Sequence, residues 1–464
     1  MDPNMDIIGF MGGTQLQKSY KNYRLNKYII EVKLAKDVNL LYNALTGAII
    51  KLADFELSDI YTTKDRFYRN YMIETYYFVP DNFNEDNVIT EYRNKVKAPI
   101  NENYLDKLGG FTILTTTACN ARCPYCYQHS LKNKKHMTLE TAEKVSDYII
   151  NSSFRGDKLL LDWFGGEPLF NKEVIDLITC RVGNSGREFT SSMISNSYLF
   201  DLETIIHAKN FWNLTNVQVT LDGTAPVYNK IKNYIYKDDT NPFQTIINNM
   251  HNLLRNNIAI SLRLNVDLNN ADNLIELTKY LVEEFKDYSS NSTCGANLII
   301  YCWPLFEIGF TRTEEERKQL CNKLSQINQI IFQNNFGHFS DYTNGIKGRH
   351  CMADSGNNVV IMPNGDLGLC EHHISDFIFG NINDPNNKDW DNINHWRQYV
   401  PYEDICKDCP IKPSCLKLGD CPSYKICSPS EKEYMINRAK LGIIAEYNNY
   451  INRNNSCQNC SCKN

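Results

Sequence analysis

The sequence predicts an α/β protein whose centre is a parallel sheet or open barrel of six strand–helix units. Between Phe111 and about Pro304, apolar runs rich in β-branched and aromatic residues alternate with longer segments of helical periodicity. Parallel neighbours need crossover connections, and these are right-handed, so six such units in sequence indicate one parallel sheet. A small α/β module precedes this core, and a cysteine-rich domain follows it.

The elements of the core follow from short apolar runs and the periodic segments between them. The expected strands are Phe111–Thr117, Leu159–Trp163, Ser191–Ser195, Val217–Leu221, Ile258–Val266 and Asn297–Trp303. The expected helices are Leu139–Ile150, Glu173–Cys180, Leu202–Ala208, Phe243–Leu254 and Asn273–Phe285. Polar or glycine residues punctuate the strand ends, namely Cys119, Gly165, Asn196, Asp222 and Asp267. Because loops at the carboxyl ends of barrel strands build the active site, we expect the chemistry to gather on one face.

Two flanking regions differ in composition from the core. Residues 20–95 carry a strand pattern at Tyr28–Leu34 and a helix pattern at Val38–Leu45, which is typical of a small α/β or winged-helix-like module. The charged, amphipathic stretch Thr311–Asn334 predicts a helix, and cysteine, glycine and proline dominate from Cys351 onward. We therefore divide the chain into an N-terminal module, a barrel, a helical connector, a metal-folded domain and a cysteine-rich tail, at residues 1–108, 109–310, 311–350, 351–450 and 451–464.

Composition excludes several classes of partner. The 464 residues carry a net charge of −5, and no basic stripe marks a nucleic-acid partner. The amino terminus lacks the positive charge of a signal peptide, and no apolar run is long enough to span a bilayer. We therefore expect a cytoplasmic chain with no membrane partner. Seventeen cysteines in such a chain favour metal ligation over disulfides.

Three closely spaced cysteines follow the first expected strand. Cys119, Cys123 and Cys126 are separated by three and two residues, which places their thiolates in one short loop. Three protein ligands to a four-iron cube leave one iron open to a bidentate amino and carboxylate ligand. A structural zinc loop is the alternative, but such sites want four ligands, usually from paired Cys-x2-Cys knuckles.

This triad, the aromatic Tyr125 and the position after the first barrel strand resemble the radical S-adenosylmethionine (SAM) superfamily. The run Gly165-Gly166-Glu167-Pro168 after the second strand is similar to that family's contact for the methionine amino group. Paired glycines let backbone carbonyls approach a cationic amine without an intervening side chain. The resemblance implies a partial (β/α)6 TIM-like barrel, a 4Fe-4S cluster on the three cysteines, and SAM as cofactor.

The same resemblance extends to later strand ends. Ser195, Asn196 and Asp222 match segments around the cofactor's carboxylate and ribose, and Arg263 and Asn265 match a polar ladder on the fifth strand. Taken singly, each residue is better explained as a strand-end cap or a turn. Their recurrence at successive strand ends favours cofactor binding.

The carboxyl-terminal part carries a second cysteine pattern, formed by Cys351, Cys370, Cys406, Cys409, Cys415, Cys421 and Cys427. It resembles the SPASM domain of peptide-modifying radical enzymes, which usually holds two auxiliary 4Fe-4S clusters and would bring the total to three. By this resemblance Cys351, Cys370 and Cys421 bind the inner cluster, which keeps one open iron, and the other four bind the outer cluster. The gaps from Cys415 to Cys421 and from Cys421 to Cys427 differ in length from the usual gaps of that family. Zinc knuckles are the alternative for the Cys-x2-Cys pair.

The surroundings of the last ligand and the remaining cysteines lead to further expectations. A helix should begin after Cys427, because Ser428 and Glu431 form a capping box with Pro429 at the first helical position. Four cysteines in apolar patterns should be small core residues, namely Cys180, Cys294, Cys302 and Cys321. The tail cysteines Cys457, Cys460 and Cys462 should lie in a disordered end, with cluster ligation or mimicry of a cysteine-rich substrate as alternatives.

The resemblance implies that the cluster splits the cofactor into methionine and a 5′-deoxyadenosyl radical, which abstracts an unactivated hydrogen. We expect a maturase that installs a thioether or carbon–carbon crosslink, or an epimerisation, in a small ribosomal precursor peptide. An external flavodoxin- or ferredoxin-type donor would supply electrons. The segment Tyr28–Phe78 weakly resembles winged-helix modules that bind a leader peptide as an added strand. A plain cap on the barrel is the alternative for this segment.

Glu371 is the candidate catalytic residue. It follows Cys370 and could accept the proton that a substrate radical releases on oxidation. The alternative is that Glu371 is an ordinary solvated loop acid beside His372. Two other functions stay open. One is an anaerobic sulfatase-maturing enzyme, whose barrel usually begins near the amino terminus. The other is a non-catalytic zinc or iron-sulfur protein.

Overall fold

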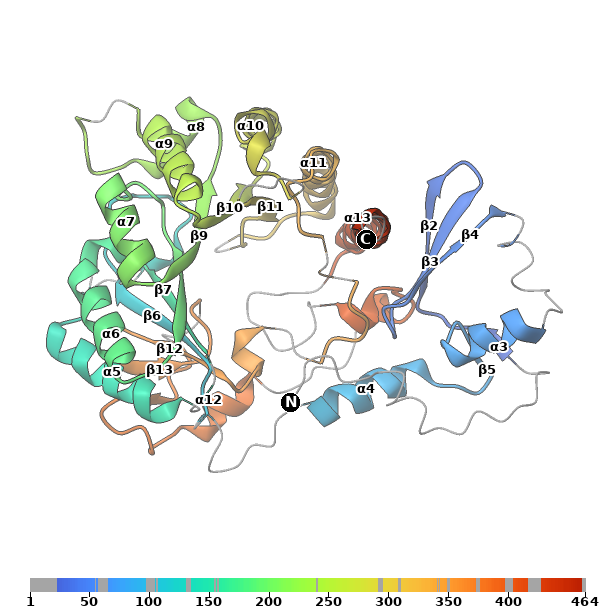
Figure 1. The fold of residues 1–464 in the computed structure, drawn as a ribbon, viewed down its shortest axis with the longest axis horizontal. Helices are drawn as coiled ribbons and strands as arrows, with labels where there is room; N and C mark the ends of the chain where they lie inside the picture. Colours follow the sequence, from blue (N-terminus) through green and yellow to red (C-terminus); the bar gives the residue numbers. More distant parts are fainter. Residues whose placement is uncertain are drawn as a thin grey trace.

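The structure is a computed structural model whose elements are labelled in Figure 1. It describes residues 23–54, 56, 66–96, 105, 107–130, 135–153, 156, 158–238, 241–290, 295–307, 310–339, 341, 343–348, 351–372, 376–396, 404–415 and 427–460. In this part of the chain no helix combines the length and the apolarity needed to cross a bilayer. Cys294, Cys421 and Cys462 lie outside the described residues.

The six predicted strands form one parallel sheet in the order of the sequence. They are β6 (Gly110–Thr116), β7 (Leu159–Gly165), β8 (Phe189–Ile194), β9 (Leu214–Leu221), β10 (Ala259–Val266) and β11 (Leu298–Pro304). The helices are α5 (Leu139–Ser152), α6 (Lys172–Asn184), α7 (Leu202–Phe211), α8 (Ala225–Lys232), α9 (Pro242–Arg255), α10 (Ala271–Glu284) and α11 (Glu314–Gln333). Figure 1 shows these helices along the outer side of the curved sheet. The predicted α/β partial barrel is confirmed.

The two faces of the sheet differ in burial. In β7, Leu161 and Trp163 are fully buried against the helices, whereas Asp162 between them points to the opposite face and is half-buried. Burying a large apolar side chain contributes about 1.5–3 kcal/mol, so the helical side supplies most of the stability. Parallel sheets are usually covered on both faces. The face opposite the helices, here called the inner face, instead carries half-buried polar side chains, namely Asp162, Ser192, Gln218, Arg263 and Tyr301.

Part of the cysteine-rich region extends the barrel sheet. β12 (Asn358–Ile361) pairs in parallel with β6, and β13 (Asp366–Gly368) and β14 (Gly380–Asn381) continue antiparallel to a nine-stranded sheet. The side chain of Asn358 in β12 lies over Gly110 of β6, where a Cβ would come within 1.7 Å of Asn358 Oδ1, so a larger residue at 110 would displace this side chain. The predicted domain boundaries stay predictions.

The N-terminal module contains an antiparallel sheet in the order β2-β3-β4, formed by β2 (Ile29–Ala35), β3 (Val38–Asn43) and β4 (Ile49–Leu52). Around it lie β1 (Tyr23–Leu25), α3 (Arg66–Glu74), β5 (Phe78–Pro80) and α4 (Glu85–Val96), with β1 paired to β5. The predicted helix at Val38–Leu45 is wrong. Leu40 and Tyr42 enter one hydrophobic core and Leu41 enters another, so this central strand is apolar on both faces and lacks alternation.

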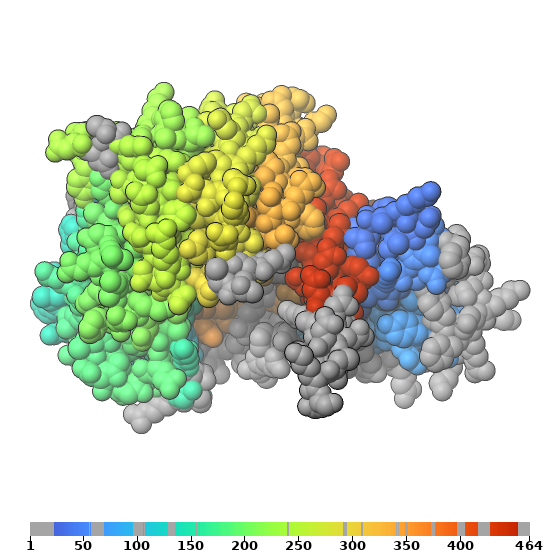
Figure 2. Space-filling model, turned by 45° about the horizontal axis from the view of Figure 1, so that its top comes forward, coloured from blue at the N-terminus to red at the C-terminus, as the bar shows by residue number. Residues whose placement is uncertain are grey.

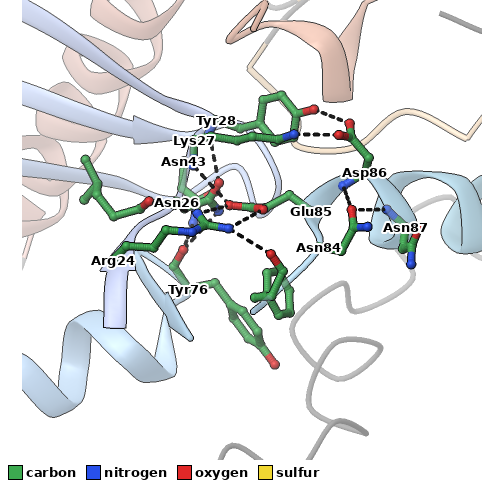
Figure 3. A network of polar contacts seen from close by, with 12 residues as sticks. Arg24, Asn26, Lys27, Tyr28, Asn43, Tyr76, Asn84, Glu85, Asp86 and Asn87 are labelled. Atoms are coloured by element: carbon green, nitrogen blue, oxygen red, sulfur yellow. Dashed lines mark hydrogen bonds and ion pairs between the residues drawn. The ribbon is translucent and has the colours of Figure 1, made fainter. Parts of the chain in front are cut away.

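A polar network holds the start of α4 against β1 and β2 (Figure 3). Both oxygens of Glu85 accept from the Arg24 guanidinium at 2.6 and 2.8 Å. Asp86 accepts from Lys27 Nζ and Tyr28 Oη, each at 2.5 Å. Burial opposes the ionised form of Asp86, but its hydrogen bonds outweigh burial and lower its pKa to about 2.

The N-terminal module packs onto the later cysteines. Lys412, between Cys409 and Cys415, is buried and places its Nζ 2.6 Å from Asp86 Oδ1. Arg93 of α4 donates to the carbonyls of Lys347, Lys412 and Pro413 at 3.0 to 3.3 Å. One hydrophobic core joins this module to Cys409, Ile411 and the last helix. The module is therefore fixed to the cysteine-rich region by apolar packing, an ion pair and hydrogen bonds.

Two long helices connect these parts. The predicted helix Thr311–Asn334 is confirmed as α11, and the predicted capping box begins α13 (Pro429–Cys460) with Ser428 N to Glu431 Oε2 at 2.9 Å and Glu431 N to Ser428 Oγ at 3.2 Å. Figure 2 shows α13 in red between α11 in orange and the N-terminal module in blue. Because α13 reaches Cys460, the expectation of a disordered tail is wrong up to that residue.

Short elements complete the described chain. They are α12 (Trp390–His395) and the 3-10 helices η1 (Tyr127–Ser130), η2 (Pro168–Asn171), η3 (Lys286–Tyr288), η5 (Met352–Asp354), η6 (Asp404–Cys406) and η7 (Lys412–Ser414). η1 follows directly on Cys126, and η2 begins at Pro168 of the glycine-rich run.

Candidate active site

The loop after β6 carries Cys119, Cys123 and Cys126, all half-buried. Arg122 fixes the loop from within, because its Nη1 donates to the carbonyl of Cys119 at 2.6 Å. The backbone N of Arg122 also donates to the carbonyl of Lys232 at 2.7 Å, which ties the loop to the end of α8. The three thiols therefore lie at the carboxyl end of the first barrel strand.

The donor chemistry of this loop fits an iron-sulfur cluster. The charge of Cys123 contributes to the raised pKa of Cys119, and the charge of Cys126 contributes to the raised pKa of Cys123, so the thiols are electrostatic neighbours. The sulfur of Cys119 accepts from Ala121 N at 3.4 Å and from Asn196 Nδ2 at 3.8 Å, and such contacts stabilise thiolate ligands. Burial raises the pKa of Cys119 to about 12, a cost that a bound metal charge offsets.

The glycines of the run after β7 pack against the start of the cysteine loop. Gly165 has φ of +133°, and a Cβ there would lie 2.1 Å from the carbonyl oxygen of Thr116. A Cβ on Gly166 would lie 2.2 Å from the carbonyl oxygen of Ala118. Glu167 N donates to that same Ala118 oxygen at 2.9 Å. The glycines are thus required for contact between two strand-end loops, a reason that the sequence does not show.

The Glu167 carboxylate joins the second and third strand ends. It accepts from Ser195 Oγ and Asn196 N, each at 2.9 Å, and from Leu169 N at 3.3 Å. The side chain is fully buried, and burial raises its pKa to about 7 in spite of these hydrogen bonds. Asn196 Nδ2 also donates to Asn120 Oδ1 at 2.6 Å, which brings this pair beside Cys119.

A second network joins the cysteine loop to β9 and β10. Tyr125 Oη lies 2.8 Å from both carboxylate oxygens of Asp222, and Asn265 Nδ2 lies 3.2 Å from Asp222 Oδ1. Arg263 Nε donates to Asn265 Oδ1 at 2.8 Å. Asp222 is completely buried, and a buried lysine, Lys232, lies 3.0 Å from its Oδ2. The structure thus brings together the predicted residues of the first, fourth and fifth strand ends.

Glu371 lies near the inner face of the sheet. Its carbonyl accepts from Tyr127 Oη at 3.5 Å, and its carboxylate lies 3.8 Å from Nε2 of His372. The His372 ring packs against the Tyr127 ring at a tilt of 34°, with centroids 4.7 Å apart. Burial raises the pKa of Asp162 to about 6, with Glu371 contributing. The glutamate is only a quarter exposed. Its role as a proton acceptor stays a prediction.

The later cysteines differ from one another in exposure. Cys351 is exposed, whereas Cys370, Cys406, Cys415 and Cys427 are half-buried and Cys409 is buried. Cys409 N donates to the Cys406 carbonyl at 3.2 Å, which places these two in one turn. In the described residues, the loop of Cys119 to Cys126 included, no group of three or more Cys, His, Asp or Glu side chains already surrounds a common metal position. The auxiliary ligand sets stay predictions.

Cysteines predicted to be core residues fall into two groups. Cys302 and Cys321 are buried, as predicted. Cys180 is exposed on α6, so that prediction is wrong, because the helix turns this position away from its apolar stripe. Sequence reasoning also missed Asn120, Asp162 and Lys232. Nothing in the local sequence separates Lys232 from the equally basic Lys230 on the same helix.

Substitution of Gly166 by valine should weaken SAM binding by about tenfold or more, a cost of about 1.4 kcal/mol, because the new Cβ displaces the carbonyl of Ala118 just before Cys119. Equilibrium binding of SAM measures the effect. Gly183→Ala is the control, since its Cβ meets only a ring atom of Phe189 at 3.7 Å in α6. Equal affinities for SAM in the two variants would show that the Gly165–Pro168 run is only a turn and does not contribute to cofactor binding.

A curved α/β sheet with three cysteines at the end of its first strand is the arrangement that the resemblance to the radical SAM superfamily implies, and sequence comparison agrees with it. Residues 113–281 match the radical SAM superfamily. This part of the chain is therefore a radical SAM superfamily domain.

Individual relatives are distant. An uncharacterized protein of Methanocaldococcus jannaschii is 24% identical over 61% of this chain and 91% of its own. The radical SAM cyclopropyl synthase TigE of Paramaledivibacter caminithermalis is 22% identical over 78% of this chain and 74% of its own. The solved structure of native anSMEcpe with bound AdoMet has a TM-score of 0.55 at 16% identity, covering 75% of this chain and 99% of that one. This likeness shows a shared fold.

Proposed function

We propose that this protein is a radical SAM maturase that acts on a ribosomally made peptide. The observation that carries the proposal is the gathering of the cysteine loop, the Glu167 network and the Asp222 network at the carboxyl ends of adjacent strands. When bound, a 4Fe-4S cluster on Cys119, Cys123 and Cys126 supplies the electron that cleaves SAM to a 5′-deoxyadenosyl radical. The half-buried polar inner face then receives the peptide.

The cofactor site is proposed to contain the predicted residues of the Glu167 network, the Asp222 network and the glycine run after β7. These are Tyr125, Gly165, Gly166, Glu167, Pro168, Ser195, Asn196, Asp222, Arg263 and Asn265. Their contacts with one another fix the strand-end loops before any cofactor binds. Glu167 places a buried negative charge there for the cofactor's amino group. The later cysteines would hold two auxiliary clusters, with Cys351, Cys370 and Cys421 as ligands of the inner one.

Two observations support a peptide substrate. The protein anSMEcpe shares the fold and was solved with a bound Cp18Cys peptide. The N-terminal module offers sheet edges, because β2 and β4 each pair with β3 alone in the described residues. A leader peptide can add as a strand to such an edge. The first barrel strand, β6, begins only at Gly110. This long leading module disfavours the sulfatase-maturing alternative, whose barrel usually begins near the amino terminus.

The test is anaerobic turnover of the iron-reconstituted full chain with SAM, a reductant and candidate precursor peptides encoded beside its gene. We expect 5′-deoxyadenosine together with a peptide that has lost two hydrogens, as a thioether or carbon–carbon crosslink requires. Epimerisation would instead leave the mass unchanged and introduce solvent deuterium. A colourless, zinc-only protein that never forms 5′-deoxyadenosine would contradict the proposal.

Glu371→Gln should lower the rate of peptide modification by about 100-fold, the usual contribution of a positioned proton acceptor, and leave SAM cleavage intact. The rate of product formation is measured by mass spectrometry alongside 5′-deoxyadenosine. Glu203→Gln on the exposed start of α7 is the matched control. Full turnover of the Glu371 variant would identify this residue as an ordinary loop acid.

A further inference from the structure

Lys232 and Asp222 form an ion pair that is withdrawn from water. Lys232 ends α8 and is 4% exposed, and Asp222 follows β9 and is 0% exposed. Their Nζ and Oδ2 atoms are 3.0 Å apart. The ammonium also lies 3.4 Å from Tyr125 Oη and 5.6 Å from the centroid of the Tyr228 ring. Both charges therefore act in a medium of low dielectric, where charges interact strongly.

This ion pair is attached to the cysteine loop at two points. Tyr125, which lies between Cys123 and Cys126, bonds to both oxygens of Asp222. The backbone of Arg122, which precedes Cys123, donates to the Lys232 carbonyl at 2.7 Å. Asp222 also accepts a hydrogen bond from Asn265 of β10 at 3.2 Å, so the ion pair contacts two strand ends as well as the loop. Buried ion pairs seldom stabilise a fold more than apolar residues of similar size, which favours a further role for this one.

Both charges lie beside the cysteine loop. Nζ of Lys232 lies 3.4 Å from the hydroxyl oxygen of Tyr125, a residue of that loop. Both carboxylate oxygens of Asp222 lie 2.8 Å from the same hydroxyl oxygen. Each charge therefore acts on the loop from a buried position, where screening by water is weak.

We propose that Lys232 is a positioning residue whose buried charge, balanced by Asp222, sets the reduction potential of the cluster held by Cys119, Cys123 and Cys126. The inference rests on the cluster assignment in the proposed function. Reduction adds one negative charge to the cluster, and a nearby buried cation stabilises that charge. Asp222 opposes the effect, so the net influence depends on both members.

The test is a charge series in the reconstituted full chain: Lys232→Met, Asp222→Asn and the double variant. The midpoint potential of the SAM-sensitive cluster is measured by redox titration of its paramagnetic resonance signal. Lys232→Met should shift the potential to more negative values and Asp222→Asn to more positive ones. The double variant should return toward the wild-type value, a cancellation that loss of packing alone would not produce.

Two controls keep the outcomes separate. Lys232→Arg keeps the charge and should keep the potential, and if Lys232→Met fails to fold, the shift in Asp222→Asn decides. Unchanged potentials in variants that bind the cluster would overturn the inference. The signal itself must vanish when the three loop cysteines are replaced. Its persistence there would instead contradict the proposed cluster site, whatever the charge series shows.

Discussion

Replacement of Cys119, Cys123 and Cys126 together by alanine will reduce the formation of 5′-deoxyadenosine to the uncatalysed background, a loss of about 10⁶-fold or more. The three thiols lie on one loop, and the networks around Glu167 and Asp222 converge on it. Without thiolates there is no ligand for the cluster that delivers the electron. The measurement is chromatography of the nucleoside products after anaerobic reconstitution and reduction.

The same variant should still bind iron through the later cysteines, which lie on other elements. Cys180→Ala, an exposed cysteine on α6, serves as the matched control and should keep full SAM cleavage. If the triple variant still produces 5′-deoxyadenosine, the radical cluster lies elsewhere in the chain. If it loses all iron, the later cysteines do not hold auxiliary clusters.

The barrel strands could be predicted because each one is short, apolar and followed by polar residues. The same rule failed for β3, where Leu41 packs into a different core from Leu40 and Tyr42, so the alternating pattern of a strand is absent. It also missed β12, β13 and β14. Strands of two to four residues give too few positions for a pattern, and pairing with β6 is a long-range contact.

The site was predictable where a local motif carries the chemistry. The cysteine loop and the glycine run are motifs of this kind, and the structure brings both to one edge of the sheet. Lys232 could not be found in this way, because its importance comes from contact with Asp222 and Tyr125 across separate strand ends. The auxiliary ligand sets depend on tertiary placement to an even greater degree.

The affinity for SAM should rise with pH up to about 7 and fall again above about 8, because Glu167 must lose its proton, and the cofactor's amino group must keep its own, for the two to pair. Burial raises the pKa of this carboxyl to about 7 from an ordinary value near 4.5. The amino group of the cofactor, with a pKa of about 7.7–8.0, stays protonated below that point. The dissociation constant should therefore increase by about 16-fold between pH 7, where half of the carboxyl is still protonated, and pH 5.5, and its slope should approach about tenfold per pH unit below pH 6.

Calorimetric titration of the apo cofactor site in two buffers of different ionisation enthalpy counts the protons exchanged on binding. About one proton should leave at pH 6, whereas at pH 8 about half a proton should be taken up, because the amino group of the free cofactor is then about half deprotonated. The same pKa has a consequence for folding. The folded chain holds this proton more tightly than the unfolded chain, so the contribution of Glu167 to stability is complete below pH 4.5. It falls by about 3 kcal/mol as the pH rises to 7. Glu167→Gln should remove the pH dependence of the SAM affinity below pH 7 and this contribution to the pH dependence of stability, whereas Glu371→Gln should keep both. A pH-independent affinity in the wild-type protein would restrict Glu167 to bracing Ser195 and Asn196 and exclude it from contact with the cofactor.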